Sequence, residues 1–337
     1  MNDAELAEKL VRVLQRPDGD TKLRPVHTIG ISATGFFEPS PIARNFCKAG
    51  HFCTDRSDVI TRFSNGSGAA QVHDGWSDVR GMAVRFHLSD GKDTDLIAMT
   101  LPEFFAPTPE GFLDFAEMAK PKPYKGQTPW QKIAGLLQLI LPARDPYPGE
   151  TISPDEGAIQ FADENAYAQL GVMQAAEIGA PVSYVREAYH AVHTFVVTGE
   201  DGTQRWVRFS WQPIAGVLKT DPHKTPVDDY LRQELQDRLA QEPARFSLMM
   251  MIGEIGDDFN DSSRPWPPHR KRIMMGTLTL NAVPEDQIAD NEKLSFNPGL
   301  LTDGIALSDD PVLQIRVKSY QVSSDWRDGS PCPFSKG

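Results

Sequence analysis

The sequence predicts an α+β fold built around an antiparallel β-barrel. Short β-rich segments fall into two groups, at about 59–100 and 192–280, with predicted helices between and beside them. Short Gly-containing loops typical of hairpins join neighbouring segments, Ser89-Asp90-Gly91-Lys92 in the first group and Glu200-Asp201-Gly202-Thr203 in the second. With 337 residues, 40% of them hydrophobic, the chain can bury a core of the size that a barrel needs.

The N-terminal half is expected to begin with a helix and continue into a sheet. Residues 4–15 have the apolar spacing of a short amphipathic helix, which we expect to pack on the body of the protein or on a partner. The sheet is expected to begin at Asp58. Its first strands are predicted at Val59–Ser64, Gly81–Leu88 and Asp95–Thr100.

Helices and further strands are predicted to follow in alternating blocks. Pro107-Thr108-Pro109 precedes a helix over residues 110–120, and two more helices are expected at 130–141 and 163–177. Strands at 192–197 and 206–211, a helix at 227–241 and strands at 246–252 and 273–280 complete the pattern. Since no repeat or linker interrupts it, residues 1–337 are expected to form a single domain, with 1–20 as an N-terminal helix or arm and 328–337 as a loose tail.

The charge of the chain excludes most polyanionic partners. The formal net charge is -12 and the isoelectric point is near 5.1, so nucleic acid would be repelled. The one basic cluster, His269-Arg270-Lys271-Arg272, is predicted to be a solvated loop and the start of a strand.

Composition also bears on location and on metal binding. No secretory signal is visible, and the longest apolar run, at 133–141, is about half the length of a membrane span, so no membrane partner is expected. Three cysteines, an odd number, suit a reducing compartment, which predicts the cytoplasm. Cys47, His51 and Cys53 lie close in sequence, but zinc needs a fourth ligand and none is convincing, so no metal site is assigned there.

The most informative motif lies near the C-terminal end. Arg316, Tyr320 and Arg327 are about one and two helical turns apart, so their side chains share one face of a predicted helix. A phenol, with a pKa near ~10, stays neutral at pH 7 unless a strong positive potential favours the phenolate, which Arg316 together with a metal could supply. Tyrosinate is one of the few axial ligands of haem iron, whereas the alternative is an ordinary solvated face.

Motifs in the N-terminal third give this segment a context. They are Arg24–Glu38, which contains Pro25-Val26-His27, then Ile60–Ser64, Asp78–Phe86, Asp95-Leu96-Ile97 and Pro102-Glu103-Phe104-Phe105. Together with the terminal Arg-x-x-x-Tyr, this ordered series resembles the haem catalase family over roughly residues 20 to 330. Because the chain stops soon after the tyrosine segment, it looks like the short catalase-related peroxidases, which lack the C-terminal helical region of full catalases. The resemblance implies an eight-stranded antiparallel barrel with surrounding helices and a bound haem b (iron protoporphyrin IX).

The resemblance also implies residues on the peroxide side of the haem. His27 takes the distal position, where it accepts a proton from hydrogen peroxide and returns it to the leaving oxygen. Ser64 would hydrogen-bond one nitrogen of the His27 ring and fix its tautomer, and Val26 would limit access from above. Read without the resemblance, a single histidine in this context is more often structural.

The remaining implied residues hold the haem. Tyr320 is the axial iron ligand, supported by Arg316, which His193 supports in turn. Phe112 would lie against the macrocycle, although a phenylalanine in a helix is equally well explained as core. The propionates would be held by three arginines, whose planar guanidinium groups match a carboxylate: Arg24, Arg62 and Arg327.

One departure from the family pattern bears on activity. Full catalases carry an asparagine after an Asp-Leu-Val-Gly stretch, and its amide assists peroxide binding; here Asp95-Leu96-Ile97-Ala98 is followed by Met99. A thioether cannot donate a hydrogen bond. Loss of one donor at a reacting centre costs about 2.7–4 kcal/mol, or about 10²–10³ in rate. We therefore expect weak dismutation of peroxide.

The function predicted from these features is a haem peroxidase that reduces hydrogen peroxide or an organic hydroperoxide and oxidises a small organic donor. Two alternatives stay open. One is a hydroperoxide-rearranging enzyme of the allene oxide synthase type, although such enzymes have threonine where this chain has Val26. The other is a non-catalytic haem-binding protein. Besides peroxide and the reductant, the expected partner is a second copy in a homodimer.

Overall fold

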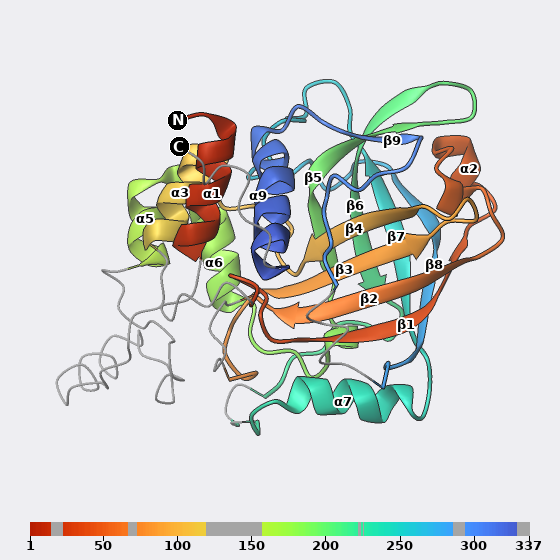
Figure 1. Ribbon diagram of the computed structural model, residues 1–337, viewed down its shortest axis with the longest axis horizontal. Helices are drawn as coiled ribbons and strands as arrows, with labels where there is room; N and C mark the ends of the chain where they lie inside the picture. Colours follow the sequence, from red (N-terminus) through yellow and green to blue (C-terminus); the bar gives the residue numbers. More distant parts are fainter. Residues whose placement is uncertain are drawn as a thin grey trace.

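The computed structural model describes residues 1–14, 23–66, 73–118, 157–221, 224, 226–285 and 294–328. Eight antiparallel strands form a barrel in the order β4-β3-β2-β1-β8-β7-β6-β5, which closes where Met99 of β4 pairs with His190 of β5 (Figure 1). The predicted closed antiparallel barrel is thereby confirmed. Its strands are β1 (Gly30–Pro39), β2 (Ser57–Asn65), β3 (Arg80–His87), β4 (Asp93–Met99), β5 (Tyr189–Thr198), β6 (Gln204–Pro213), β7 (Ala244–Ile252) and β8 (Arg272–Ala282).

The prediction that the sheet begins at Asp58 is wrong, because β1 precedes it. Two glycines weaken the strand signal of β1, yet the barrel requires at least one of them. A Cβ at Gly35 would lie 1.9 Å from the carbonyl oxygen of Thr279 on β8, so only glycine lets the two strands approach this closely. A short ninth strand, β9 (Ile305–Leu307), was not predicted either; it pairs with Phe195–Val197 of β5.

A single segment, residues 294–307, joins the two strands at which the barrel closes. On the β4 side, the Asp95 amide donates to the carbonyl of Leu300 at 2.8 Å, and the Asn297 amide donates to the Asp95 carboxylate at 2.9 Å. On the β5 side, β9 adds its own backbone pairs. The barrel is thus closed by this segment as much as by direct pairing of β4 with β5. We call residues 294–307 the seam segment.

Side chains alternate between an apolar interior and a more polar outer face. The interior is filled by aromatic rings, among which Phe37 makes edge-on contacts with Phe86 at 5.3 Å and with Trp211 at 6.2 Å between ring centroids. On β2, Phe63 is fully buried in this core. Because successive residues of a strand point to opposite faces, Arg62 and Ser64 project from the outer face.

Most helices of the described part gather on one side of the barrel (Figure 1). Helix α9 (Pro311–Arg327) lies next to the strands, and α1 (Asp3–Leu14) packs on α9 and on α3 (Pro109–Met118). The predicted N-terminal helix therefore packs on the body of the protein, where Lys318 of α9 donates to Asp3 at 2.6 Å. Further helices are α2 (Ala43–Phe46), α5 (Ala158–Glu164), α6 (Gln169–Glu177) and α7 (Tyr230–Leu239).

The prediction of one helix over residues 163–177 is wrong. Helix α5 ends at Glu164, and α6 begins at Gln169 after a 3-10 turn at Ala166–Ala168. Asn165 explains the break: its backbone is extended, and its side-chain amide donates to the carbonyl of Phe161 at 3.0 Å. An asparagine that satisfies the last carbonyls of a helix competes with continuation of that helix.

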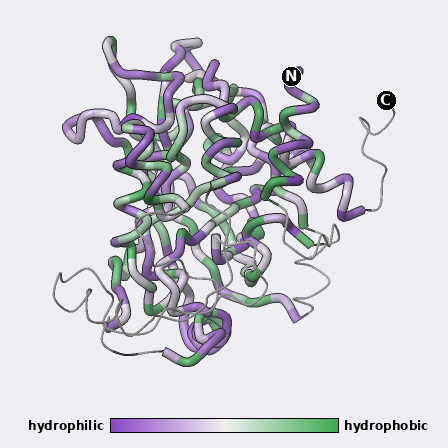
Figure 2. Tube along the Cα trace, turned by 90° about the vertical axis from the view of Figure 1, so that its left-hand side faces the viewer, coloured by the Kyte–Doolittle hydropathy of each residue, from purple (hydrophilic) through white to green (hydrophobic). Residues whose placement is uncertain are grey.

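Other predicted helices differ at their ends. Helix α7 begins at Tyr230 rather than at 227, since Asp229 has a left-handed backbone, and it ends at Leu239. The helix predicted at 130–141 lies outside the described residues. Figure 2, in which α7 is seen nearly end-on at the bottom of the molecule, shows its largely hydrophilic character; it docks through Leu231, Leu235 and Leu239. Among the described residues, no helix combines the length and apolarity needed to cross a bilayer.

His51 is a polar residue placed inside the apolar barrel core. Its ring stacks on Phe86 with centroids 4.4 Å apart and touches Phe52 at 4.0 Å. Its Nδ1 atom has no hydrogen-bond partner within the described residues. Burial lowers the pKa of His51 to about 3, so the folded protein keeps this imidazole neutral down to strongly acidic pH.

Replacement of His51 by phenylalanine is predicted to reduce the acid sensitivity of folding. The unfolded chain protonates His51 near pH 6.5, whereas the folded chain does so only near pH 3, so stability falls as pH drops through this window. From pH 8 to pH 5, His51 alone accounts for about 2 kcal/mol of lost stability. Urea unfolding of His51→Phe at both pH values should show a pH dependence smaller by this amount. The exposed His87→Phe is the control, and an unchanged pH dependence in His51→Phe would contradict the assignment.

Candidate functional site

Helix α9 carries the C-terminal motif, and Asp310 fixes where this helix begins. One carboxylate oxygen of Asp310 accepts hydrogen bonds from the amides of Val312 at 2.8 Å and Leu313 at 3.2 Å, while Pro311 occupies the first helical position. An aspartate cap followed by proline is a strong helix start, because proline has no amide hydrogen to leave unpaired. The start of α9 sets the direction in which Arg316 and Tyr320 project.

A continuous row of hydrogen bonds runs from Asp310 to Tyr320. The second carboxylate oxygen of Asp310 lies 2.7 Å from Nδ1 of His193, and Nε2 of His193 lies 2.8 Å from Nη1 of Arg316. Nη2 of Arg316 donates to the Tyr320 hydroxyl at 2.9 Å. The structure therefore brings together three predicted site residues, His193, Arg316 and Tyr320, and adds Asp310. We refer to these four residues as the proximal row.

Only one arrangement of protons satisfies the proximal row. Arginine has donors and no acceptor, so Nε2 of His193 must accept from Arg316. The Asp310 carboxylate has only acceptors, so Nδ1 of His193 must carry the proton and donate it. The row therefore requires a neutral His193 protonated at Nδ1.

Burial supports this protonation state. It lowers the pKa of His193, which favours the neutral imidazole. Burial by itself would raise the pKa of Asp310, but the interaction with His193 and the amides of the helix start outweigh it and hold the pKa of this carboxyl below its usual value. Asp310 is therefore a carboxylate in the folded protein, and it can accept the His193 proton throughout the neutral pH range.

His27 has a strained backbone held by its surroundings. Its φ angle is +58°, a left-handed conformation that is uncommon for a residue other than glycine. The amide of His27 donates to the carbonyl of Gly66 at 3.2 Å, and its own carbonyl accepts from Arg62 at 3.0 Å. Strain of this kind persists where the surrounding structure enforces it, and it concentrates at functional sites.

The side chain of His27 is fixed as tightly as its backbone. Its Nδ1 atom lies 3.0 Å from the hydroxyl oxygen of Ser64. A Cβ on Gly81 would lie 2.8 Å from both His27 Nδ1 and the Ser64 hydroxyl oxygen, so only glycine leaves room for this pair. Burial and, to a smaller extent, the charges of Arg62, Arg316 and Arg24 together lower the pKa of His27 to about 3. The ring is therefore neutral at pH 7, and Arg316 of the proximal row lies within electrostatic reach of it.

Three predicted arginines form a cluster: Arg24 and Arg62 lie within electrostatic reach of His27, and Arg327 lies within reach of Arg62. Arg24 and Arg327 both donate to the carbonyl of Leu294, in the seam segment, and Arg327 also donates to the hydroxyl of Ser295 at 3.3 Å. Burial, helped by the charge of Arg327 and opposed by a smaller effect of Tyr184, lowers the pKa of Arg62 to about 10. Arginines brought this close in a buried place favour an anionic ligand.

Met99 lies in the same row of the sheet as Ser64. Ser64 on β2 pairs with Gly81 on β3, and Gly81 pairs with Met99 on β4. Directly paired residues project from the same face of a sheet, so Met99 is on the His27 side, separated from Ser64 only by the glycine. Met99 also packs against the apolar cluster that α1, α3 and α9 form.

The structure places Phe112 and Val26 less directly. Phe112 on α3 packs in that helical cluster, with its ring 5.1 Å from Phe104 and 5.7 Å from Phe105. The ring centroid of Phe104 lies 5.6 Å from that of His193. Phe104 therefore lies between Phe112 and the proximal row. Val26, immediately before His27, is partly buried.

Sequence reasoning missed Asp310 and Gly81. The Asp310-Pro311 pair is itself a helix-start signal, so Asp310 could have been found as a cap, although its contact with His193, 117 residues away, could not. Gly81 lies within the motif Asp78–Phe86, but the sequence alone predicts no role for this glycine. Its importance lies in the space that it leaves for His27 and Ser64, which a single sequence does not show.

The described residues contain no group of three or more His, Cys, Asp or Glu side chains arranged to hold a metal ion directly. The Cys47 thiol donates to the carbonyl of Gly304 at 3.4 Å, and burial raises its pKa to about 12. Cys47 is thus a poor candidate for a thiolate ligand.

Comparisons with known proteins agree with this geometry. The family model described as "Catalase" matches residues 1–135 and 148–331. A catalase-related peroxidase of Mycolicibacterium paratuberculosis is 30% identical over 308 residues, which cover 91% of this chain and 89% of that protein. A catalase-related peroxidase of Synechococcus elongatus is 27% identical and covers 88% of this chain and 81% of that protein.

Longer catalases match over part of their length. Catalase-2 of Bacillus subtilis is 27% identical, with 92% of this chain and 46% of that protein covered. The crystal structure of a fungal catalase superposes with a TM-score of 0.74 at 23% identity, over 91% of this chain and 59% of the other. That likeness is one of fold.

Replacement of Asp310 by asparagine is predicted to disturb the tautomer of His193. An asparagine can still cap α9 through its oxygen, but its amide then presents a donor to the Nδ1–H of His193. The resulting conflict should lower the free energy of unfolding by about 1–3 kcal/mol and raise the fraction of His193 protonated at Nε2.

Nitrogen-15 NMR of the imidazoles in the haem-free chain measures the tautomer, and urea unfolding measures the stability. The matched control is Asp93→Asn, because Asp93 makes the same kind of contact, at 2.8 Å, with the exposed His87. Identical imidazole spectra of His193 in the parent and in Asp310→Asn would refute the proton arrangement of the proximal row.

Proposed function

The chain belongs to the catalase family, and from this premise we propose that it is a haem-dependent peroxidase. It is an oxidoreductase that acts on peroxide. In the proposed reaction it reduces hydrogen peroxide or an organic hydroperoxide and oxidises a small organic donor, with weak release of oxygen. The observation that carries the proposal is the Tyr320 hydroxyl held by Arg316 at the end of the proximal row.

The residues present fit a haem b group by their chemistry. A haem needs an axial donor, cations for two propionates and a tightly packed wall on which a flat ring can lie. The chain offers the Tyr320 oxygen as donor and the Arg24, Arg62 and Arg327 guanidiniums as cations. Gly81 leaves the room in which His27 and Ser64 lie against each other, and this pair would face the bound peroxide.

The proximal row stabilises negative charge on the Tyr320 oxygen. An N–H of Arg316 donates to this oxygen at 2.9 Å, and a hydrogen bond from a charged donor is roughly twice as strong as one between neutral groups. His193 and Asp310 hold the guanidinium in place, so the donor keeps its direction. The Tyr320 oxygen would therefore hold the haem iron. The haem, when bound, supplies an iron that can exchange electrons with peroxide and with an organic donor.

His27 is the proposed acid and base for cleavage of the oxygen–oxygen bond. Its pKa of about 3 means that the ring is neutral and can accept a proton from peroxide. The same low proton affinity means that the ring gives the proton up readily to the leaving oxygen. Contact with Ser64 through Nδ1 leaves Nε2 as the nitrogen for this transfer.

Met99 is the residue proposed to limit oxygen release. It projects from the same face as Ser64, one pair beyond Gly81, so an amide in its place would lie on the side of the sheet that carries His27. A thioether at this position offers no N–H. Cleavage of the first peroxide by His27 does not need that donor, so peroxidase chemistry is retained while dismutation is weak.

The two alternative functions differ in their products. A hydroperoxide-rearranging enzyme would convert a lipid hydroperoxide to an epoxide without consuming a donor, and a haem-binding protein without catalysis would leave peroxide unchanged. The fixed pair of His27 and Ser64 favours catalysis over storage, since a storage site has no use for a strained, neutral imidazole.

Replacement of Tyr320 by phenylalanine is predicted to remove the oxygen ligand of the iron. The visible and electron paramagnetic resonance spectra of the purified protein should lose the signature of tyrosinate ligation, because phenylalanine has no donor atom. Tyr167→Phe, which changes a phenol on a surface 3-10 turn, is the control. A Tyr320→Phe spectrum identical to that of the parent, or a parent protein that carries no porphyrin, would contradict the proposal.

Replacement of Met99 by asparagine is predicted to raise the rate of oxygen release from hydrogen peroxide at least tenfold. The amide restores a hydrogen-bond donor, and one such donor changes rates by about 10²–10³ at other reacting centres. An oxygen electrode measures this rate, and a chromogenic donor assay run beside it measures peroxidase turnover. Met99→Leu, which has a similar size and no donor, should stay at the rate of the parent. Equal oxygen release in both variants would show that Met99 is not the limiting residue.

A further inference from the structure

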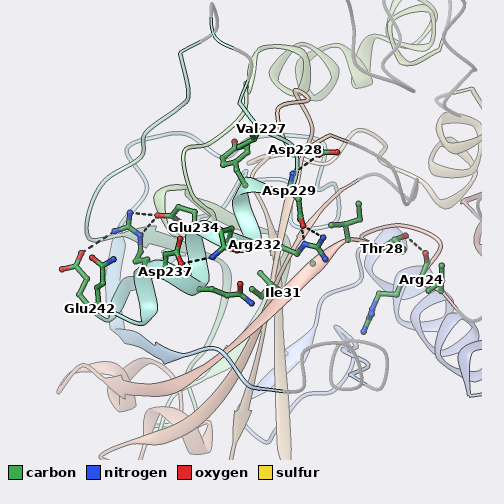
Figure 3. Close-up of a pocket in the computed structure, with 18 residues that line it drawn as sticks. Arg24, Thr28, Ile31, Val227, Asp228, Asp229, Arg232, Glu234, Asp237 and Glu242 are labelled. Atoms are coloured by element: carbon green, nitrogen blue, oxygen red, sulfur yellow. Dashed lines mark hydrogen bonds and ion pairs between the residues drawn. The ribbon is translucent and has the colours of Figure 1, made fainter.

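A large groove lies beside residues 23–31, the segment that carries His27, and apart from the site described above. Its volume is about 1090 Å³, and it is bounded by α7 on one side and by residues 23–31 on the other. Figure 3 shows the side chains of Arg232, Glu234 and Asp237 projecting from α7, and Arg24 and Thr28 on the opposite wall. Neither the proximal row nor the pair of His27 and Ser64 lines this groove.

The backbone of residues 28–30 lies between the groove and the guanidinium group of Arg62. Thr28 lines the groove, and its carbonyl accepts a hydrogen bond from Arg62 at 3.1 Å. Gly30 also lines the groove, and a Cβ at this position would lie 2.6 Å from Nη2 of Arg62. Arg24 belongs to both places. A molecule in the groove is thus a near neighbour of the groups proposed to hold the haem propionates.

The lining of the groove combines an apolar part with an acidic excess. Leu23, Ile29, Ile31, Val227 and Tyr230 supply apolar surface, and Val227 is 78% exposed. Five acidic and three basic side chains also line it, which leaves two negative charges in excess.

The acidic excess is not cancelled by ion pairs inside the groove. Arg232 pairs with Asp229, and Arg238 pairs with Glu234 and Glu242. Asp237, which is exposed, accepts instead from the neutral amide of Gln233 at 2.9 Å. Such a lining attracts cations, and the net charge of -12 on the whole chain adds to this attraction.

We propose that this groove binds the reducing donor and that the donor is an aromatic amine carrying positive charge. The apolar wall suits the ring and the acidic side chains suit the amine, while anionic phenols or sulfonates are disfavoured. This proposal rests on the peroxidase function proposed above. Each donor molecule loses one electron and one proton, so two donor molecules supply the two electrons and two protons that reduce one hydrogen peroxide to two waters.

The test reverses one charge of the groove. In Asp237→Lys the Michaelis constant for a cationic aromatic amine should rise roughly fivefold at low ionic strength, and that for an anionic donor should fall, since the substitution replaces an attraction of the cation by a repulsion. Both shifts should shrink in 0.5 M salt. Asp114→Lys, the same change on the exposed face of α3, is the matched control and should keep both constants.

A second measurement does not depend on turnover. Phenyltrimethylammonium, a cationic aromatic that cannot be oxidised readily, should bind the parent chain with or without haem and shift the NMR resonances of α7 and residues 23–31. Benzenesulfonate should not. Shifts confined to other parts of the protein, or equal binding of both probes, would overturn the assignment of the groove.

Failure of the groove and failure of the proposed function give different results. If the parent protein with haem does not react with peroxide in a stopped-flow experiment without donor, both proposals fall. If it reacts, but Asp237→Lys and Asp114→Lys show the same Michaelis constants for cationic and anionic donors, only the groove proposal is wrong.

Discussion

The structure of the site depends on the hydrogen-bonded row from Asp310 through His193 and Arg316 to Tyr320. Each member can make its contacts in only one way, because an arginine cannot accept and a carboxylate cannot donate. The order of donors and acceptors along the row is therefore fixed by residue type. Burial keeps His193 neutral, and His193 together with the amides of the helix start keeps Asp310 ionised, so the positive charge of Arg316 is directed at one oxygen. The activity proposed here follows from that direction.

The barrel holds the second part of the site, which is the pair of His27 and Ser64. Glycine at position 81 lets His27 and Ser64 pack against the sheet, and the pairing of β2, β3 and β4 sets Met99 at a defined place beside them. A neutral imidazole and a phenol supported by a guanidinium are thus held by different elements. The imidazole lies in the segment before β1 and contacts β2, and the phenol lies on α9. Neither element could form the site without the other.

Sequence reasoning predicted the antiparallel barrel and most of its strands, since alternation and hairpin loops are local signals. It also predicted the face shared by Arg316, Tyr320 and Arg327, because helical spacing is local too. It missed β1, where Gly35 serves a contact with β8 that is remote in sequence. It joined α5 and α6, because the capping side chain of Asn165 acts through geometry rather than through hydrophobic pattern. Likewise, the contact of Asp310 with His193 and the groove beside α7 depend on tertiary packing, which the pattern of one sequence does not contain.

The seam segment has a consequence for engineering of this protein. Residues 294–307 bridge β4 and β5, and the same stretch offers Leu294 and Ser295 to Arg24 and Arg327. An insertion or a protease cut there would loosen the closure of the barrel and would also release Arg24 and Arg327 from their backbone and side-chain partners. The hairpin tip at Glu200-Asp201-Gly202-Thr203 is exposed and has local turn contacts, such as the Thr203 amide to Asp201 at 2.9 Å, so a tag or a fused domain belongs there.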